Sequence, residues 1–96
     1  MIRFEWDDEK ARINWNKRHI SFEEATEVFD DPLAVVLPDP YEYEQRWRIV
    51  GRTTTHLILL LVVHTSREDD DTEIIRIISA RPLEPHERSL YEHGKL

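Results

Sequence analysis

The chain has 96 residues, two glycines, no cysteine and a formal net charge of −7. This length predicts one domain, residues 1–96, that buries roughly 60–65% of its unfolded surface around one core. The lack of cysteine excludes disulfides and thiolate metal sites, and with no signal-peptide pattern at the start it favours the cytoplasm. The acidic charge disfavours bulk attraction to nucleic acid or an anionic membrane.

The first segment reads as a strand followed by a helix. Residues 2–6 alternate apolar and polar side chains, which is typical of a half-buried strand. The aspartates that follow can cap a helix that runs to about Arg18, with Ala11 and Trp15 expected on its buried face. A basic cluster, residues 17–19, lies at its end, where positive charge stabilises the helix dipole.

A second helix, four strands and a third helix are predicted for the rest of the chain. Residues 21–24 have the capping-box pattern Ser-Phe-Glu-Glu, which predicts a helix ending near Asp30. Residues 84–93 are predicted to form the last helix, with Leu90 turned inward. The strands are predicted over residues 33–37, 46–52, 56–65 and 73–81.

The most apolar of these strands contains the uninterrupted run Leu57–Val63, which is flanked by two histidines. The run is far too short for a membrane span, which needs about 20 apolar residues. It fits a strand buried on both faces at the centre of a sheet, joined to the next strand by the acidic loop 68–71. We therefore predict an α+β domain: a small, mainly antiparallel sheet with two N-terminal helices on one face and a C-terminal helix across it.

The histidines and carboxylates do not have the spacing of a metal site. His56 and His64 are separated by about 26 Å if they lie on one strand. His86 and His93 are about 10 Å apart along a helix. Phosphate-binding glycine loops and a nucleophile elbow are also absent from the sequence. We therefore expect no metal and no cofactor.

The arginines of the strands are the remaining candidates for a functional site. Arg52, Arg67 and Arg81 lie at strand ends, and Arg76 interrupts an apolar strand. Such guanidinium groups can clamp a phosphate and neutralise charge that develops during its transfer. They can equally pair with the 20 Asp and Glu residues of the chain. The sequence leaves both interpretations open.

Short motifs that together suggest a family are distributed over almost the whole chain. The most specific are Ile20-Ser-Phe-Glu-Glu-Ala25 and Ile77-Ile-Ser-Ala-Arg81. Others are Phe4-x-Trp6-Asp7, Val28-Phe-Asp-Asp-Pro-Leu33, Arg46-Trp47-x-x-x-Gly51-Arg52 and Glu87-x-x-x-Tyr91. In these motifs the chain resembles the BrnT family, the ribonuclease toxins of type II toxin–antitoxin systems.

The resemblance implies a RelE-like fold and a toxin that cleaves RNA without metal. It also implies neutralisation by a BrnA-type antitoxin, in a two-plus-two assembly that contacts DNA only through the antitoxin. Lys17 matches the family pattern, whereas Arg18 stands where the family usually has His and His19 where it has Gly. If that helix end requires a left-handed backbone conformation, histidine can adopt it, but less favourably than glycine. Thr65-Ser-Arg67 resembles the family's Thr-Glu-Arg.

The expected chemistry is attack of an RNA 2′-hydroxyl on the adjacent phosphate. Lys17, or alternatively His19 or Tyr91, could transfer protons, whereas arginine stays protonated and serves as an electrostatic clamp. The proposed catalytic residues are Lys17, Arg52, Arg67 and Arg81; accessory candidates are His19, Thr65, Arg76, Glu87 and Tyr91.

A second hypothesis is a non-catalytic interaction module that binds a basic partner, which the net charge of −7 favours. A nuclease requires a positive concavity despite the acidic total, and this feature distinguishes the two hypotheses.

Overall fold

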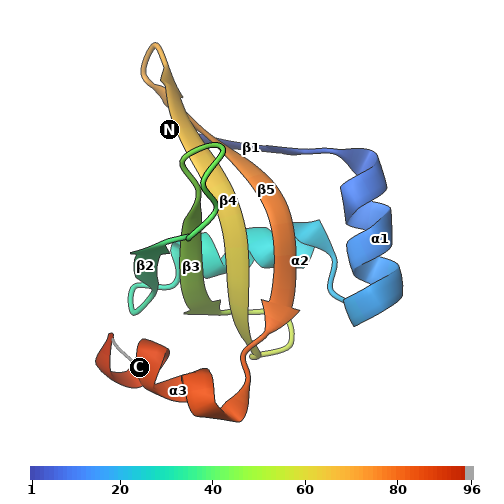
Figure 1. Ribbon diagram of the computed structural model, residues 1–96, viewed down its shortest axis with the longest axis vertical. Coiled ribbons are helices and arrows are strands. Elements are labelled where there is room, and N and C mark those ends of the chain that lie inside the picture. Colours follow the sequence, from blue (N-terminus) through green and yellow to red (C-terminus); the bar gives the residue numbers. More distant parts are fainter. Residues whose placement is uncertain (95–96) are drawn as a thin grey trace.

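The computed structural model describes residues 1–94, which form one five-stranded sheet with helices packed on it (Figure 1). The strand order is β1-β5-β4-β3-β2; β1 runs parallel to β5, and the other neighbouring pairs are antiparallel. The strands are β1 (Ile2–Trp6), β2 (Val35–Pro38), β3 (Trp47–Arg52), β4 (Leu59–Asp69) and β5 (Thr72–Pro82). The helices are α1 (Asp8–Arg18), α2 (Phe22–Ala25), η1 (Thr26–Asp30), η2 (Pro85–Glu87) and α3 (Arg88–His93). The predicted α+β class and element order are confirmed.

The core lies on both sides of β4, as the apolar run predicted. On one face, here called the back face, Leu60 and Val62 pack with Phe22 of α2 and Val28 of η1. On the opposite front face, Leu61 packs with Val50 of β3 and Leu90 of α3. Leu60 and Val62 are 0% exposed, which fits a strand covered on both faces. No helix within residues 1–94 has both the length and the apolar character of a membrane span.

The hairpin of β4 and β5 is longer than predicted. Glu68 and Asp69 belong to β4, so only Asp70 and Asp71 form the turn instead of a four-residue loop. Asp70 has a φ of 55°, which aspartate tolerates better than most residues. Two-residue turns with positive φ match the twist of an antiparallel pair, so the strands remain paired to the end of the acidic segment.

The start of β4 is later than predicted, because residues 53–58 form a folded connection. Leu57 adopts a φ of 57° and is 67% exposed, so the apolar run begins outside the sheet. His56 also lies outside the strand, where its Nδ1 is 2.9 Å from Oε1 of Glu24. The backbone N–H of Thr53 donates to the carbonyl of Ile58 across this connection at 2.9 Å.

Helix α1 buries a different face from the predicted one. Trp15 is 50% exposed, whereas Asn14 is buried and Ala11 is half-buried. The side chain of Asn14 donates to the carbonyl of Ile20 at 3.0 Å and accepts from the backbone N–H of Ala80 at 3.1 Å. Because α1 lies beside β5 at one side of the sheet (Figure 1), it buries only a narrow stripe, and a polar bridge holds it there.

The second helix is less regular than predicted. It is one α-helical turn, α2, that tightens into the 3-10 helix η1 and ends at Asp30. Ser21 accepts the backbone N–H of Glu24 at 3.0 Å, so half of the predicted capping box is present. The carboxylate of Glu24 instead contacts His56.

Candidate active site

A cationic pocket of about 340 Å³ lies between α1 and the end of β5. Its charged lining residues are Lys10, Lys17 and Arg18 from α1 and Arg81 from β5, and no carboxylate lines it. The remaining lining residues are Ile13, Asn14, Ile78, Ser79 and Ala80. On a chain of net charge −7, this pocket is a local concentration of positive charge.

Helical periodicity explains why these cations share one pocket. Lys10, Asn14 and Lys17 are spaced four and three residues apart, which places them on one face of a helix. Because Asn14 is fixed to the backbone of β5, the same face directs both lysines toward that strand. The helix ends at His19, whose φ of 56° and ψ of 33° are left-handed, a conformation that histidine tolerates less readily than glycine.

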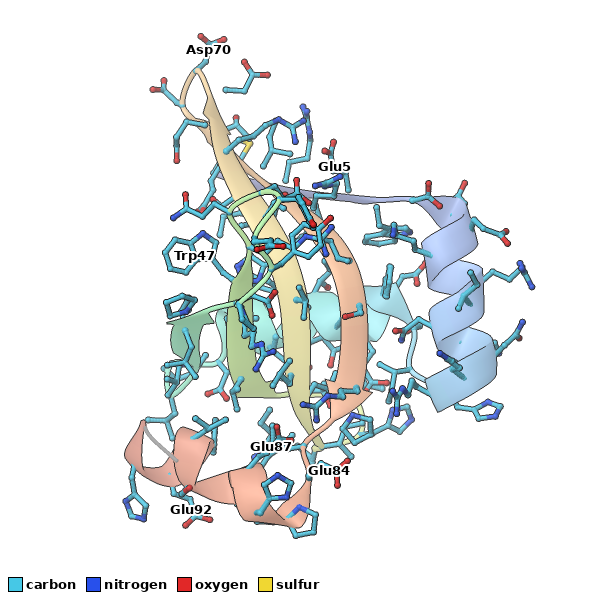
Figure 2. The ribbon with its side chains drawn as sticks, in the orientation of Figure 1. Glu5, Trp47, Asp70, Glu84, Glu87 and Glu92 are labelled. Carbon is cyan, nitrogen blue, oxygen red and sulfur yellow. The ribbon has the colours of Figure 1, made fainter. Side chains whose placement is uncertain are left out.

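Arg81 is held in place by a buried carboxylate. Its Nη1 and Nη2 donate to the two carboxylate oxygens of Glu87 at 2.7 and 2.8 Å. Glu87 lies where the chain leaves the sheet (Figure 2) and is 9% exposed. The bonds from Arg81, with a further bond from the backbone N–H of Glu84, lower the pKa of Glu87 to about 2. An arginine has five N–H groups, so Arg81 keeps donors for a ligand in the pocket.

Arg52 and Tyr91 lie together near the same end of the sheet. The guanidinium carbon of Arg52 is 5.9 Å from the centre of the Tyr91 ring. The Tyr91 hydroxyl and the backbone N–H of Arg52 donate to the same oxygen of Asp31 at 2.7 and 2.8 Å. Burial and the bond to Asp31 raise the pKa of Tyr91. Arg52 also lines a separate pocket of about 300 Å³ with Arg88.

Arg67 and Arg76 occupy the other half of the front face and are paired with acids. Arg67 donates to Glu5 at 2.7 Å, and Arg76 donates to Glu44 at 2.8 Å. Nε of Arg76 is 3.4 Å from the hydroxyl of Thr65 on the neighbouring strand. Arg67 and Arg76 therefore form the ion pairs that the sequence allowed as the alternative to phosphate binding.

The register of the sheet separates Arg67 from Arg52 and Arg81, the other two arginines that the sequence grouped with it. Arg81 lies opposite Leu61 and Arg52 opposite Leu59, whereas Arg67 lies further along β4 itself. Arg67 is six residues beyond Leu61 and eight beyond Leu59, which corresponds to about 20–26 Å along the strand. Arg67 therefore does not reach a phosphate held by Arg81.

The structure thus brings Lys17 and Arg81 into one pocket, with Glu87 bonded to Arg81, and places the other candidates elsewhere. His19 lines a different groove, where its ring is 5.4 Å from that of Trp15. Lys10 and Arg18 line the cationic pocket but were not among the predicted site residues. Lys10 could have been identified from the sequence, because it precedes Lys17 by seven residues, or two helical turns, and so lies on the same helix face.

The carboxylates and histidines of residues 1–94 do not form a cluster suited to binding a metal ion. No group of three or more metal-ligating side chains that could hold a metal ion occurs among residues 1–94.

Comparison with known proteins identifies the family. A family model described as the ribonuclease toxin BrnT of type II toxin–antitoxin systems matches residues 6–87. A search of curated proteins found no match to the chain. The matched segment begins at the last residue of β1 and ends at the carboxylate that holds Arg81. Because the match covers most of the sequence, the chain belongs to the BrnT family of ribonuclease toxins.

Proposed function

We propose that this toxin is a metal-independent endoribonuclease that holds the scissile phosphate of RNA in the pocket between α1 and β5. The observation that carries the proposal is the lining of that pocket: four lysine and arginine residues and no acidic residue, on a chain of net charge −7. A nuclease requires such a positive concavity, whereas a module that binds a basic partner does not need one. The pocket is centred on Lys17 and Arg81.

The residues of the pocket suit cleavage by internal transfer. The RNA 2′-oxygen bonds to phosphorus while the bond from phosphorus to the 5′-oxygen breaks, which leaves a 2′,3′-cyclic phosphate and a 5′-hydroxyl. The reaction needs proton transfer at both oxygens and positive charge around the phosphorane. We assign to the Lys17 ammonium the donation of a proton to the leaving 5′-oxygen, while the 2′-hydroxyl releases its proton to solvent water. Charge stabilisation is assigned to Arg81 and Arg18. Glu87 positions Arg81 through its two hydrogen bonds.

The remaining candidates act at a distance from that phosphate. Arg52 and Arg67 are assigned to other phosphates of the same RNA. Arg67 would contact one several nucleotides from the scissile phosphate, since the strand register places it about 20 Å or more from Arg81. Thr65 and Arg76 lie beside Arg67 on the front face. His19 and Tyr91 remain accessory candidates for proton transfer and RNA contact.

The family is that of a toxin with an antitoxin partner. We propose that the partner is a BrnA-type protein, that the complex contains two copies of each chain, and that it acts in the cytoplasm. Any contact of the complex with DNA is assigned to the antitoxin.

RNA cleavage by the purified toxin in the presence of EDTA tests the proposal. We expect cleavage to persist and Lys17→Ala to reduce its rate by about 10²-fold or more. Arg12→Ala is the matched control, because Arg12 lies on the same helix, pairs with Glu9 and does not line the pocket. Cleavage that is abolished by EDTA and restored by a divalent ion would contradict metal independence. Equal rates for the wild type and Lys17→Ala would remove the pocket from the mechanism.

A further inference from the structure

The back face of the sheet is covered by helices over only part of its length. Helices α1, α2 and η1 pack on β5 and β3, and Phe29 of η1 is the last covering side chain at the edge of an open groove. The groove has a volume of about 350 Å³ and lies toward the hairpin end of the sheet. Its lining residues come from all five strands and η1: Ile2, Phe29, Val36, Trp47, Ile49, His64, Ser66, Glu73 and Ile75.

The groove is mainly apolar, and the side chains at its two ends are exposed. Ile2 on the outer strand β1 is 48% exposed, and Val36 on the opposite outer strand β2 is 53% exposed. Between them, Ile49 and Ile75 form a buried floor. His64 is also buried there, and burial lowers its pKa, so the floor is uncharged at neutral pH. Exposed apolar side chains that form one contiguous groove are typical of an interaction site.

The dimensions of the groove fit a helix lying across the strands. It runs diagonally from β1 to β2, because Ile2 lies level with Glu68 of β4 whereas Val36 lies level with Val62. Four inter-strand spacings (about 19 Å) and six residues along the strands (about 20 Å) place its ends about 28 Å apart. A helix of about 18 residues has this length. The packing of α2 and η1 on the same face shows that this surface accepts helices laid on it (Figure 1).

The charge beside the groove defines the partner. Glu68, Asp69, Asp70 and Asp71 are exposed at the hairpin (Figure 2 labels Asp70 at its tip), and Glu73 lies in the groove itself. Glu68 is directly opposite Glu73 in the register, so both carboxylates face the same side. A docked segment with lysines or arginines complements this edge. A second copy of the chain, with its net charge of −7, does not.

We propose that the antitoxin docks an amphipathic, positively charged helix across this groove, with its apolar side chains on Ile49 and Ile75 and its cations at the acidic hairpin. The inference rests on the antitoxin partner of the proposed function and names the surface that this partner uses. The groove and the cationic pocket share no lining residue. This helix therefore anchors the antitoxin, and another segment must cover Lys17 and Arg81 to block RNA.

Affinity for the purified antitoxin encoded with this toxin tests the proposal. Val36→Lys places a cation in the groove on an outer strand, where lysine is well tolerated. We expect it to weaken binding about tenfold or more, because the lysine sets a cation against the apolar side chains of a segment that is itself positively charged. Leu33→Lys is the matched control, because Leu33 is 67% exposed and lies outside the groove. We expect it to change the affinity by less than about twofold, since it leaves every groove contact in place.

The charge of the hairpin is tested separately. Asp70→Asn combined with Asp71→Asn should weaken binding roughly 2–5-fold at low salt, the range for exposed charges, and the difference should vanish at high salt. Asn tolerates the positive φ of residue 70, so the turn is retained. The same dissociation constant as wild type at low salt would show that the partner helix carries no cations at this edge.

Ile2→Lys, at the other end of the groove, repeats the first test, with urea midpoints confirming that each variant is folded. Wild-type affinity in both folded lysine variants would overturn the proposal. So would a dimer of the toxin alone that Val36→Lys dissociates, because the occupant would then be a second copy. RNA cleavage should be unchanged in Val36→Lys. If the wild-type toxin cleaves no RNA while Val36→Lys still weakens antitoxin binding, the proposed ribonuclease activity would be refuted and the docking surface would stand.

Discussion

Replacing Glu87 by Gln removes the negative charge that holds Arg81 while preserving the size of the side chain. Glu87 is buried and accepts two bonds from Arg81, so its carboxyl group is ionised far more easily in the folded protein than in the unfolded chain. Its pKa falls from 4.5 to about 2 on folding, chiefly because of the bonds from Arg81. We expect the substitution to lower the free energy of unfolding at neutral pH.

The size and the pH range of the effect follow from linkage. A fall in pKa from 4.5 to about 2 corresponds to about 3 kcal/mol at neutral pH. The Arg81 side chain is 30% exposed, so solvent screening reduces the expected contribution to about 1–2 kcal/mol. Because the folded pKa is the lower one, this stability is present above pH 4.5 and is lost as the pH falls toward about 2.

Urea unfolding of the wild type and the variant at neutral pH and at about pH 2.5 measures this contribution. Other carboxylates with lowered pKa values, such as Asp31 and Glu27, titrate in both proteins and cancel in the difference. Glu92→Gln is the matched control, since Glu92 is exposed on the neighbouring helix α3 (Figure 2). A difference between wild type and Glu87→Gln that stays constant from neutral to acid pH would refute the role assigned to the Arg81–Glu87 pair.

Three further substitutions test the fold and the site. Leu60→Ala, at a side chain that is 0% exposed, should cost about 2–5 kcal/mol, and an unchanged urea midpoint would contradict the central place of β4. Gly51→Ala should destabilise by about 1–3 kcal/mol, because its Cβ would lie 2.9 Å from Cβ of Val28; thermal unfolding measures this, and a gain in stability would be inconsistent with the close packing of η1 on β3. Arg67→Ala should weaken RNA affinity in a salt-dependent way with little change in the single-turnover rate on bound RNA. A roughly 10²-fold fall in that rate would place Arg67 at the scissile phosphate.

Local patterns of the sequence predicted the elements well where one physical preference dominated. The alternation in residues 2–6 and the apolar run after His56 predicted strands, because a side-chain period of two and burial on both faces leave a direct trace in the sequence. The helix end near Arg18 followed from capping and charge, and His19 adopts there the left-handed conformation that we predicted to be tolerable for histidine.

The predictions were wrong where tertiary contacts decided between local alternatives. Trp15 was expected to be buried, but α1 lies beside β5 and buries Asn14 instead, because that side chain satisfies a backbone N–H of the strand. The run of apolar residues predicted a strand from His56, whereas the connection from β3 consumes residues up to Ile58 before pairing begins at Leu59.

The sequence by itself determined the α+β class, the order of the elements and the family, and it is the basis for proposing arginine and lysine as the chemically active residues. Which of those cations share a site was decided only by the tertiary structure. Strand register separates Arg67 from Arg81, and the packing of α1 on β5 joins Lys17 to Arg81 across many residues of sequence. Register and helix packing depend on contacts between distant segments, and no local pattern of residues specifies them.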